Sequence, residues 1–282
     1  MTSPAVLMKA WRIYPKKQLG QNFLTDANMA AAIVSYTGLS TDDVVLEIGA
    51  GLGSLTIPLA RQARKVIAIE KDHRLVELLS TELTAASLAN VSLLEQDILK
   101  LDIPSLAETE NTDLTVVGNV PYNISSQILV QIVKARASIK KAILMFQKEL
   151  AQRITAPPGS KAYGRISVMV QYCARVKVLT EVKAGLFYPK PNIDSLVLGI
   201  DFDPEAGKQV RDEAFFFDVV KAAFSKRRKT LRNALTGFIP GFDAKLSAKA
   251  LEGAGIDPVR RAETLTVEEF VRLTNHIHTT YR

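Results

Sequence analysis

A glycine-rich loop is the first feature of this sequence that could bind a ligand. Residues 46–56 read Leu-Glu-Ile-Gly-Ala-Gly-Leu-Gly-Ser-Leu-Thr, an apolar run that ends in the closely spaced Gly49, Gly51 and Gly53. Glycines permit a tight turn and let a ligand touch the backbone, while a helix that follows offers unpaired N–H donors. The spacing differs from the G-x-G-x-x-G that holds a dinucleotide pyrophosphate. The loop therefore indicates a nucleotide-like ligand and makes an NAD-dependent oxidoreductase the weakest alternative.

Two acidic residues follow at the ends of the next predicted strands. Glu70 closes the strand 65–69, about 20 residues after the loop, where a carboxylate can accept both ribose hydroxyls. Asp97 follows the strand 91–94 and could meet an adenine amino group. Helix capping is the structural alternative for both acids. The order of glycine loop and strand-end acids resembles the class I S-adenosylmethionine-dependent methyltransferases.

A second polar loop, Gly-Asn-Val-Pro-Tyr-Asn at residues 118–123, follows the fourth predicted strand. The exocyclic amine of a nucleobase is a poor nucleophile because its lone pair is delocalised into the ring. The Asn119 side-chain oxygen and the Val120 carbonyl could accept its two hydrogens and favour the pyramidal nitrogen, without a dedicated base. Tyr122 could stack on a flipped base, and Pro121 keeps the loop stiff. A turn with a core tyrosine is the structural alternative.

With both loops counted, the sequence resembles the bacterial small-subunit ribosomal RNA adenine dimethyltransferases, the kasugamycin-resistance family, over nearly the whole chain. Ile193 stands where the family usually has valine, a conservative change because both residues are β-branched. Further segments carry the resemblance: Lys-Gln-Leu-Gly-Gln-Asn-Phe-Leu at 17–24, Phe-Tyr-Pro-Lys-Pro-Asn-Ile-Asp-Ser at 187–195, the basic segment 223–233, Gly-Ile-Asp-Pro at 255–258 and Arg-Ala-Glu-Thr-Leu at 261–265.

The resemblance implies a reaction and a set of residue roles. The reaction is N6,N6-dimethylation of two adjacent adenosines in the 3′-terminal hairpin loop of 16S ribosomal RNA, with S-adenosylmethionine as cofactor and a role in small-subunit maturation. The adenine would lie between Tyr122 and Phe187, although a phenylalanine taken alone is typical of a core. The implied cofactor-binding residues are Asn22, Leu24, Gly49, Gly51, Glu70, Asp97 and Asn119.

Positive charge is concentrated away from the predicted cofactor loops. The net charge is +7, yet residues 26–130 carry six basic and fourteen acidic residues. Residues 219–242 contain no carboxylate and hold the densest basic cluster. A polyanion such as ribosomal RNA would bind this cluster, for which a solvated helix face is the structural alternative. The predicted RNA-binding residues are Lys226, Arg227, Arg228, Lys229 and Arg232.

The elements that must position these residues alternate in the first two thirds of the chain. Short β-branched runs between helical patterns predict an α/β fold, a Rossmann-like parallel sheet of the class I methyltransferase type. Later segments have helical spacing without strand-like runs. We expect a methyltransferase domain with a basic N-terminal arm over 1–203 and a small all-α RNA-binding domain over 204–282. The predicted strands are 43–48, 65–69, 91–94, 114–118, 141–146 and 195–202, and the predicted C-terminal helices are 213–224, 230–237, 243–253 and 266–278.

Composition narrows the setting of the protein. The chain has 282 residues with 47% hydrophobic content, and Cys173 is its one cysteine, which excludes an internal disulfide. His276 and His278 lack the neighbours of a zinc site, so we expect no metal. No apolar run is long enough to span a bilayer, and no signal-peptide core follows Met1. We expect a cytoplasmic monomer with no membrane partner, acting on 16S ribosomal RNA in the small subunit or its precursor.

Two rival functions remain open from the sequence. The related large-subunit ribosomal RNA adenine methyltransferases that confer macrolide resistance share the chemistry, although the segment 255–265 favours the small-subunit family. A ribosome-assembly protein whose main duty is binding would come from another class. The intact loop from Asn119 to Tyr122 argues for catalysis, which can coexist with an assembly role.

Overall fold

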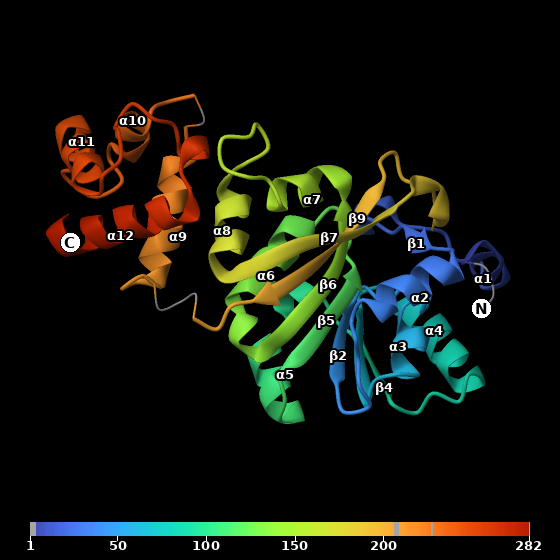
Figure 1. Cartoon of the computed structure of the whole chain (residues 1–282). Helices are drawn as coiled ribbons and strands as arrows, with labels where there is room; N and C mark the ends of the chain where they lie inside the picture. The colour runs from blue at the N-terminus through green and yellow to red at the C-terminus, as the bar shows by residue number, and fades with distance from the viewer. Residues whose placement is uncertain (1–3, 206–208, 227, 282) are drawn as a thin grey trace. The chain divides into compact units, whose positions relative to one another are not determined.

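The computed structural model describes residues 4–205, 209–226 and 228–281 (Figure 1). The chain divides into two compact units, one of residues 1–151 with 176–202 and one of residues 152–175 with 203–282. This division differs from the predicted domains in one respect. Residues 152–175, expected in the methyltransferase domain, group with the helical unit.

A mostly parallel sheet organises the first unit, as the alternation of strands and helices predicted. Within the described residues it has seven strands in the order β4-β3-β2-β5-β6-β9-β7. Strands β2 to β6 run parallel to their neighbours, and β9 pairs antiparallel with β6. The strands are β2 (Val44–Ile48), β3 (Lys65–Glu70), β4 (Val91–Glu95), β5 (Leu114–Asn119), β6 (Ile139–Gln147), β7 (Ala174–Val182) and β9 (Ser195–Phe202).

The direction of strand order reverses at β2. The chain moves from β2 outward to β3 and β4, and then returns to the other side of β2 with β5. In open α/β sheets, ligands bind in the crevice beyond the carboxyl ends of the strands at such a switch point. The residues that follow β2 and end β5 are those of the two predicted loops, so the topology brings Gly49 and Asn119 to one edge.

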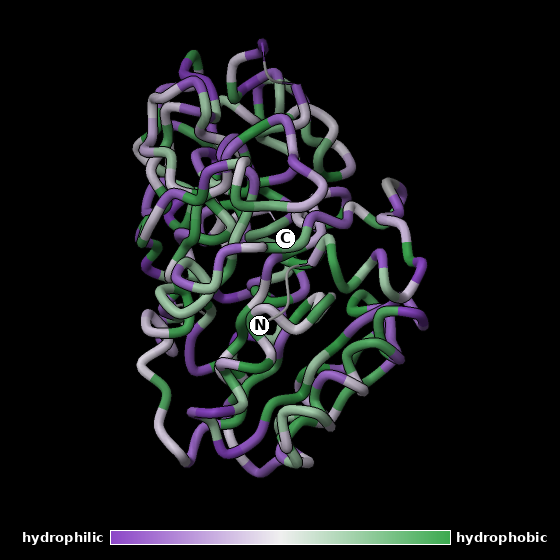
Figure 2. The backbone as a smooth tube through the Cα atoms, turned by 90° about the vertical axis from the view of Figure 1, so that its right-hand side faces the viewer, coloured by the Kyte–Doolittle hydropathy of each residue, from purple (hydrophilic) through white to green (hydrophobic). Residues whose placement is uncertain are grey.

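Helices connect the parallel strands, and aspartates begin several of them. Asp26, Asp72 and Asp102 are N-caps whose carboxylates accept backbone N–H groups of the first turns of α2, α4 and α5. Apolar and polar stretches alternate along the chain (Figure 2), as amphipathic helices over a buried sheet require. The helices are α2 (Ala27–Ser35), α3 (Thr56–Ala60), α4 (His73–Ala85), α5 (Ile103–Glu110), α6 (Ser125–Lys134) and α7 (Lys148–Ile154).

Residues 166–178, for which no element was predicted, contain parts of two elements. Helix α8 (Arg165–Cys173) runs directly into β7, which begins at Ala174. Neither glycine nor proline separates them, so no turn signal was available to divide the run. Strand β8 (Phe187–Tyr188) pairs with β1 (Phe23–Leu24) in a separate two-stranded ribbon.

The N-terminal arm packs on the first unit. Helix α1 (Pro4–Ala10) and the residues after it contribute Leu7, Met8 and Ile13 to an apolar cluster. The cluster also contains Leu75 and Leu78 of α4, together with Phe23 and Leu52. Burial of this area gives the basic arm a fixed place beside the glycine loop.

The second unit is helical, as predicted. Phe216 and Phe270 are fully buried in its core, and Tyr172 of α8 stacks on Phe216 with 4.2 Å between ring centroids. That stacking explains why α8 groups with this unit. The described helices of this unit are α8, α9 (Glu213–Ala223), α10 (Leu231–Leu235), α11 (Ala244–Gly253) and α12 (Val267–Tyr281). Of the helices described, none has the length and apolar character needed to cross a membrane.

A capping box begins α12. Glu269 N–H donates to Thr266 Oγ1 at 3.2 Å, and Thr266 N–H donates to a Glu269 carboxylate oxygen at 2.8 Å. The Thr266→Ala variant should therefore lower the free energy of unfolding by about 0.5–2 kcal/mol in urea denaturation. Thr279→Ala is the matched control, because its hydroxyl only donates to the Asn275 carbonyl on the exposed face. Equal losses in the two variants would contradict the capping role.

Candidate active site

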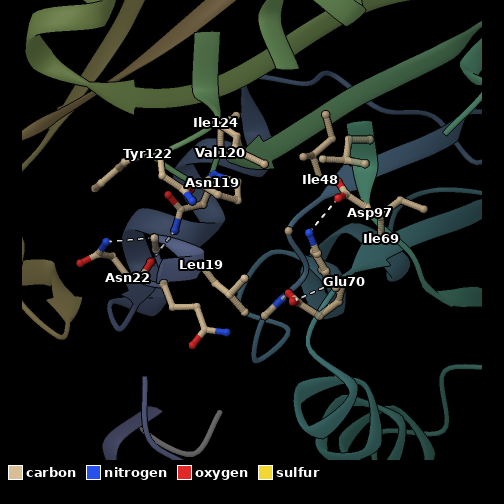
Figure 3. Close-up of a pocket in the computed structure, with 18 of the residues that line it drawn as sticks. Leu19, Asn22, Ile48, Ile69, Glu70, Asp97, Asn119, Val120, Tyr122 and Ile124 are labelled. Carbon is tan, nitrogen blue, oxygen red and sulfur yellow. Dashed lines mark hydrogen bonds and ion pairs between the residues drawn. The ribbon is translucent and has the colours of Figure 1, made fainter. Parts of the chain in front are cut away.

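A cavity lies at the carboxyl ends of β2, β3 and β5, with an empty volume of ≈ 950 Å³ including its open mouth. Figure 3 shows Asn22, Asn119 and Tyr122 on one side of it, and Glu70 and Asp97 on the other. The predicted site residues that line the cavity are Asn22, Gly49, Gly51, Glu70, Asp97, Asn119, Pro121 and Tyr122.

The glycine loop adopts a conformation that other residues rarely reach. Gly49 and Gly51 have φ values of +73° and +56°, a region in which a side chain is strained. The N–H groups of Gly49 and Ala50 both donate to the Ile69 carbonyl, at 2.9 and 3.0 Å. The turn is thereby fixed to the end of β3, and its backbone is left close to the cavity.

Glu70 fastens the glycine loop to the next strand. One carboxylate oxygen accepts the Gly51 N–H, and the other accepts the N–H groups of Lys71 and Asp72, all at 2.9 Å. Burial raises the pKa of Glu70, although the three backbone hydrogen bonds oppose that shift. The helix-capping alternative does not describe Glu70, because Asp72 is the N-cap of α4.

Asp97 lies at the cavity and also caps a short helix. It lines the cavity, and its carboxylate also caps η2 (Ile98–Lys100) by accepting the Leu99 N–H at 3.0 Å. Its other oxygen pairs with Lys71 Nζ at 2.7 Å. The hydrogen bond from Lys71 is the main cause that lowers the pKa of Asp97 and keeps it an ionised acceptor.

The side-chain amide of Asn119 has a defined orientation. Its Nδ2 donates to the Asn22 carbonyl at 2.7 Å, so the amide nitrogen is engaged with the N-terminal segment. The Oδ1 atom is therefore the part of this side chain that can act as an acceptor in the cavity. A placed acceptor of this kind is what the proposed amine chemistry requires.

Tyr122 is held by a neighbouring strand. Its hydroxyl forms a 2.7 Å hydrogen bond with Ser195 Oγ, and Ser195 is fully buried at the start of β9. Ser125 Oγ donates to the Tyr122 carbonyl at 3.0 Å and fixes the backbone. Burial raises the pKa of Tyr122, so the phenol stays protonated. The ring is consequently a rigid wall of the cavity.

Two predicted site residues lie in the core and not among the cavity-lining residues. Leu24 is 1% exposed and Phe187 is 4% exposed, and the two are directly paired in the β1–β8 ribbon. Both belong to the apolar cluster under the sheet. The placement of the adenine between Phe187 and Tyr122 stays a prediction.

The predicted RNA-binding residues belong to the helical unit. They lie between α9 and α10 or on α10 itself. Arg227 lies outside the described residues. The side chains of Lys226, Arg228, Lys229 and Arg232 are exposed, as contact with phosphates requires.

The sequence reasoning gave no role to Glu47, which lies in β2 and is 1% exposed. Burial is the main cause that raises its pKa to about 8, and the nearby Glu70 carboxylate adds to the effect. Glu47 is thus a neutral acid directly under the glycine loop. A single acid inside the apolar run 44–48 was the signal available in the sequence.

The strand order, the glycine loop at the switch point and the strand-end acids define a class I S-adenosylmethionine-dependent methyltransferase. The family model for ribosomal RNA adenine dimethylases matches residues 14–279. The chain belongs to the ribosomal RNA adenine dimethylase family, and its cofactor is S-adenosylmethionine.

Individual relatives agree with this assignment. The ribosomal RNA small subunit methyltransferase A of Desulforapulum autotrophicum is 52% identical over 275 residues, covering 98% of this chain and 96% of that protein. The protein of the same name from Shouchella clausii is 42% identical, covering 95% and 91%. A crystal structure of a dimethyladenosine transferase from Plasmodium falciparum has a TM-score of 0.80 and 25% identity, covering 91% of this chain and 98% of that one. The 23S rRNA methyltransferase ErmE shares the fold, with a TM-score of 0.67 and 24% identity, covering 91% and 99%.

The residues of the cavity fit this cofactor. A nucleoside needs a carboxylate for its ribose hydroxyls and apolar walls for its base, and Glu70 with Ile98 and Leu99 offers both beside Asp97. Glu70 would hold the ribose and Asp97 the adenine amino group. The cofactor, when bound, supplies an electrophilic methyl group.

The buried Glu47 carboxyl predicts a pH dependence of stability. Its pKa is about 8 in the folded chain and near 4.5 when exposed. The stability that it contributes is therefore complete below the lower value and is lost as the pH rises through the higher one. Glutamine does not ionise, so the unfolding free energy of Glu47→Gln minus that of wild type should rise from about pH 5 to about pH 8. Urea denaturation at both pH values measures this, with the exposed Glu108→Gln as control. A constant difference between Glu47→Gln and wild type would contradict the assignment.

Proposed function

We propose that this chain transfers methyl groups to N6 of two adjacent adenosines in the 3′-terminal hairpin loop of 16S ribosomal RNA. The product would be N6,N6-dimethyladenosine, made during small-subunit maturation. The observation that carries the proposal is the Asn119 amide, whose nitrogen is bound by the Asn22 carbonyl and whose oxygen remains an acceptor beside Tyr122. Whole-length similarity to small-subunit methyltransferases supports the choice of RNA.

The reaction would depend on placed acceptors and not on a strong base. Asn119 Oδ1 and the Val120 carbonyl would accept the two hydrogens of the adenine amine. That contact favours a pyramidal nitrogen with a localised lone pair, which is the nucleophilic form. Pro121 limits the freedom of the loop, so that the acceptors stay in place while the amine reacts.

The target base would stack on Tyr122. The ring cannot turn freely because its hydroxyl is bound to Ser195, and one base–aromatic stack contributes about 1–3 kcal/mol. Phe187 would cover the opposite face.

The cofactor would be held by residues of several segments. Glu70 would bind the ribose, and Asp97 the adenine. Gly49 and Gly51 would allow close approach of the backbone. Asn22, Leu24 and Asn119 complete the set, with Asn119 serving both ligands and Leu24 acting through its main chain, since its side chain is buried.

The RNA would be positioned by phosphate contacts from the basic arm and from the helical unit. Such contacts fix the register of the RNA without reading its sequence. The partner would be 16S ribosomal RNA in the small subunit or its precursor, met in the cytoplasm by a monomer. Incubation with radiolabelled cofactor and undermethylated small or large subunits, followed by nucleoside analysis, tests the target directly. Label in large-subunit RNA alone would overturn the proposal.

The Asn119→Ala variant should lose turnover by about a hundredfold or more, because one preorganised polar contact of the transition state is removed. Affinity for undermethylated subunits should stay near that of wild type. Asn90→Ala is the control, since its amide binds the Ala60 and Ala63 carbonyls near the opposite end of the sheet. Wild-type turnover of Asn119→Ala would remove Asn119 from the mechanism.

Neutralising Lys226 and Lys229 to glutamine should weaken binding of the subunit and flatten its salt dependence. Each lost phosphate contact reduces the slope of log K against log salt by about 0.7–0.9. Lys245 and Lys249 of α11 are exposed lysines of the same unit and provide the matched double variant. Filter binding from low to moderate salt measures the slopes. The same slope for both double variants would contradict a specific role of the cluster.

A further inference from the structure

Residues 12–24, here called the strap, connect the N-terminal arm to the rest of the first unit. Residues 18–23 line the cofactor cavity. On the β5 side, Asn119 and Asn123 donate side-chain N–H groups to the carbonyls of Asn22 and Gln18, at 2.7 and 2.9 Å. These contacts use only the main chain of the strap.

On the opposite side of the cavity the strap is held through its side chains. Lys16 Nζ and Gln21 Nε2 donate to the two oxygens of Asp72, at 2.9 and 3.1 Å. Gln21 in turn accepts the Lys16 N–H at 2.7 Å, so the three residues form one network. The Asp72 side chain is 2% exposed. The Lys16 side chain is 40% exposed, so the pair is shielded from water on the Asp72 side, where a charged acceptor makes both hydrogen bonds stronger than neutral ones.

Asp72 is also joined to the ribose-binding acid. Its main-chain N–H donates to Glu70 at 2.9 Å, while its side chain faces the strap. As an N-cap of α4 it is weak, because the Arg74 N–H lies 3.4 Å from its carboxylate. The short contacts of this carboxylate are therefore those to the strap and not those to its own helix.

We propose that Asp72 is a positioning residue for cofactor binding, which holds the strap and its Asn22 against the cavity. Because Glu70 and the strap are both attached to Asp72, cofactor occupancy and strap attachment are coupled. The coupling is reciprocal. If attachment of the strap raises the affinity for the cofactor by a given factor, a bound cofactor favours the attached strap by the same factor. The inference rests on the cofactor residues of the proposed function, but not on the choice of RNA.

The first test compares Asp72→Ala with Asp102→Ala in the full chain. Both variants remove an N-cap aspartate, but Asp102 caps α5 through the Ser105 N–H and, among the described side chains, forms no hydrogen bond with the strap. Asp72→Ala should weaken binding of S-adenosylhomocysteine by about tenfold to hundredfold in calorimetry, since two hydrogen bonds to a charged group are lost. Asp102→Ala should bind as wild type does. Equal affinity in all three proteins, or equal losses in both variants, would overturn the proposal.

Steady-state kinetics on undermethylated subunits separate positioning from catalysis. Asp72→Ala should raise the KM for S-adenosylmethionine while kcat at saturation stays within about threefold of wild type, because Asp72 does not reach the reacting atoms. A loss confined to kcat would contradict the role. If Asn119→Ala keeps wild-type turnover while Asp72→Ala behaves as expected, the role of Asn119 toward the adenine amine is removed and the role of Asp72 stands. If the chain binds no S-adenosylhomocysteine at all, both roles are removed.

A double-mutant cycle and proteolysis test the contact itself. Lys16→Met should weaken S-adenosylhomocysteine binding in the same direction, and its effect should vanish in the Asp72→Ala background. Additive effects of the two substitutions would show that the Lys16–Asp72 contact does not link the strap to cofactor binding. S-adenosylhomocysteine should also slow tryptic cleavage after Arg12 in the wild type and in Asp102→Ala, but much less in Asp72→Ala. Equal protection of all three would contradict the coupling.

Discussion

The reversal of strand order at β2 is the constraint on which the site depends. Parallel strands end at one edge, and a reversal leaves a crevice between the two strands that diverge there. In this chain the crevice lies between β2, which leads into the glycine loop, and β5, which ends at Asn119. The glycine loop and Asn119, the residue proposed to bind the amine, therefore lie at one edge of the sheet although they are far apart in the sequence.

The polar side chains of the crevice are held in place by hydrogen bonds and ion pairs within the protein itself. Glu70 is fixed by three backbone N–H groups, Asp97 by Lys71 and the Leu99 N–H, and Asn119 by the Asn22 carbonyl. Such preorganisation matters for a reaction that uses placed acceptors instead of a base, because reorientation of dipoles during the reaction would raise the barrier. The buried Glu47 beneath the loop adds a neutral acid, which avoids a second charge beside Glu70.

The N-terminal arm is part of this preorganisation. An apolar cluster with α4 packs one stretch of the arm, and polar contacts on both sides of the cavity hold the strap that follows. In the proposed function, its basic residues contact RNA phosphates. Their neighbours show a second use, because Lys16 is paired with a buried acid beside the cofactor cavity. One short segment can thus serve the cofactor and the nucleic acid.

The sequence by itself determined the strands β2 to β6 and β9, the helices α9 to α12 of the second unit, and most of the predicted site residues that line the cavity. These follow from local patterns: β-branched runs, helical spacing, and glycines or acids at strand ends. Only the tertiary structure decided that Leu24 and Phe187 lie in the core, that the run 166–178 is divided between α8 and β7, and that Asp72 is bonded to Lys16 and Gln21. Those outcomes depend on contacts between residues distant in the chain, and neither residue type nor spacing records which distant partner a side chain will meet.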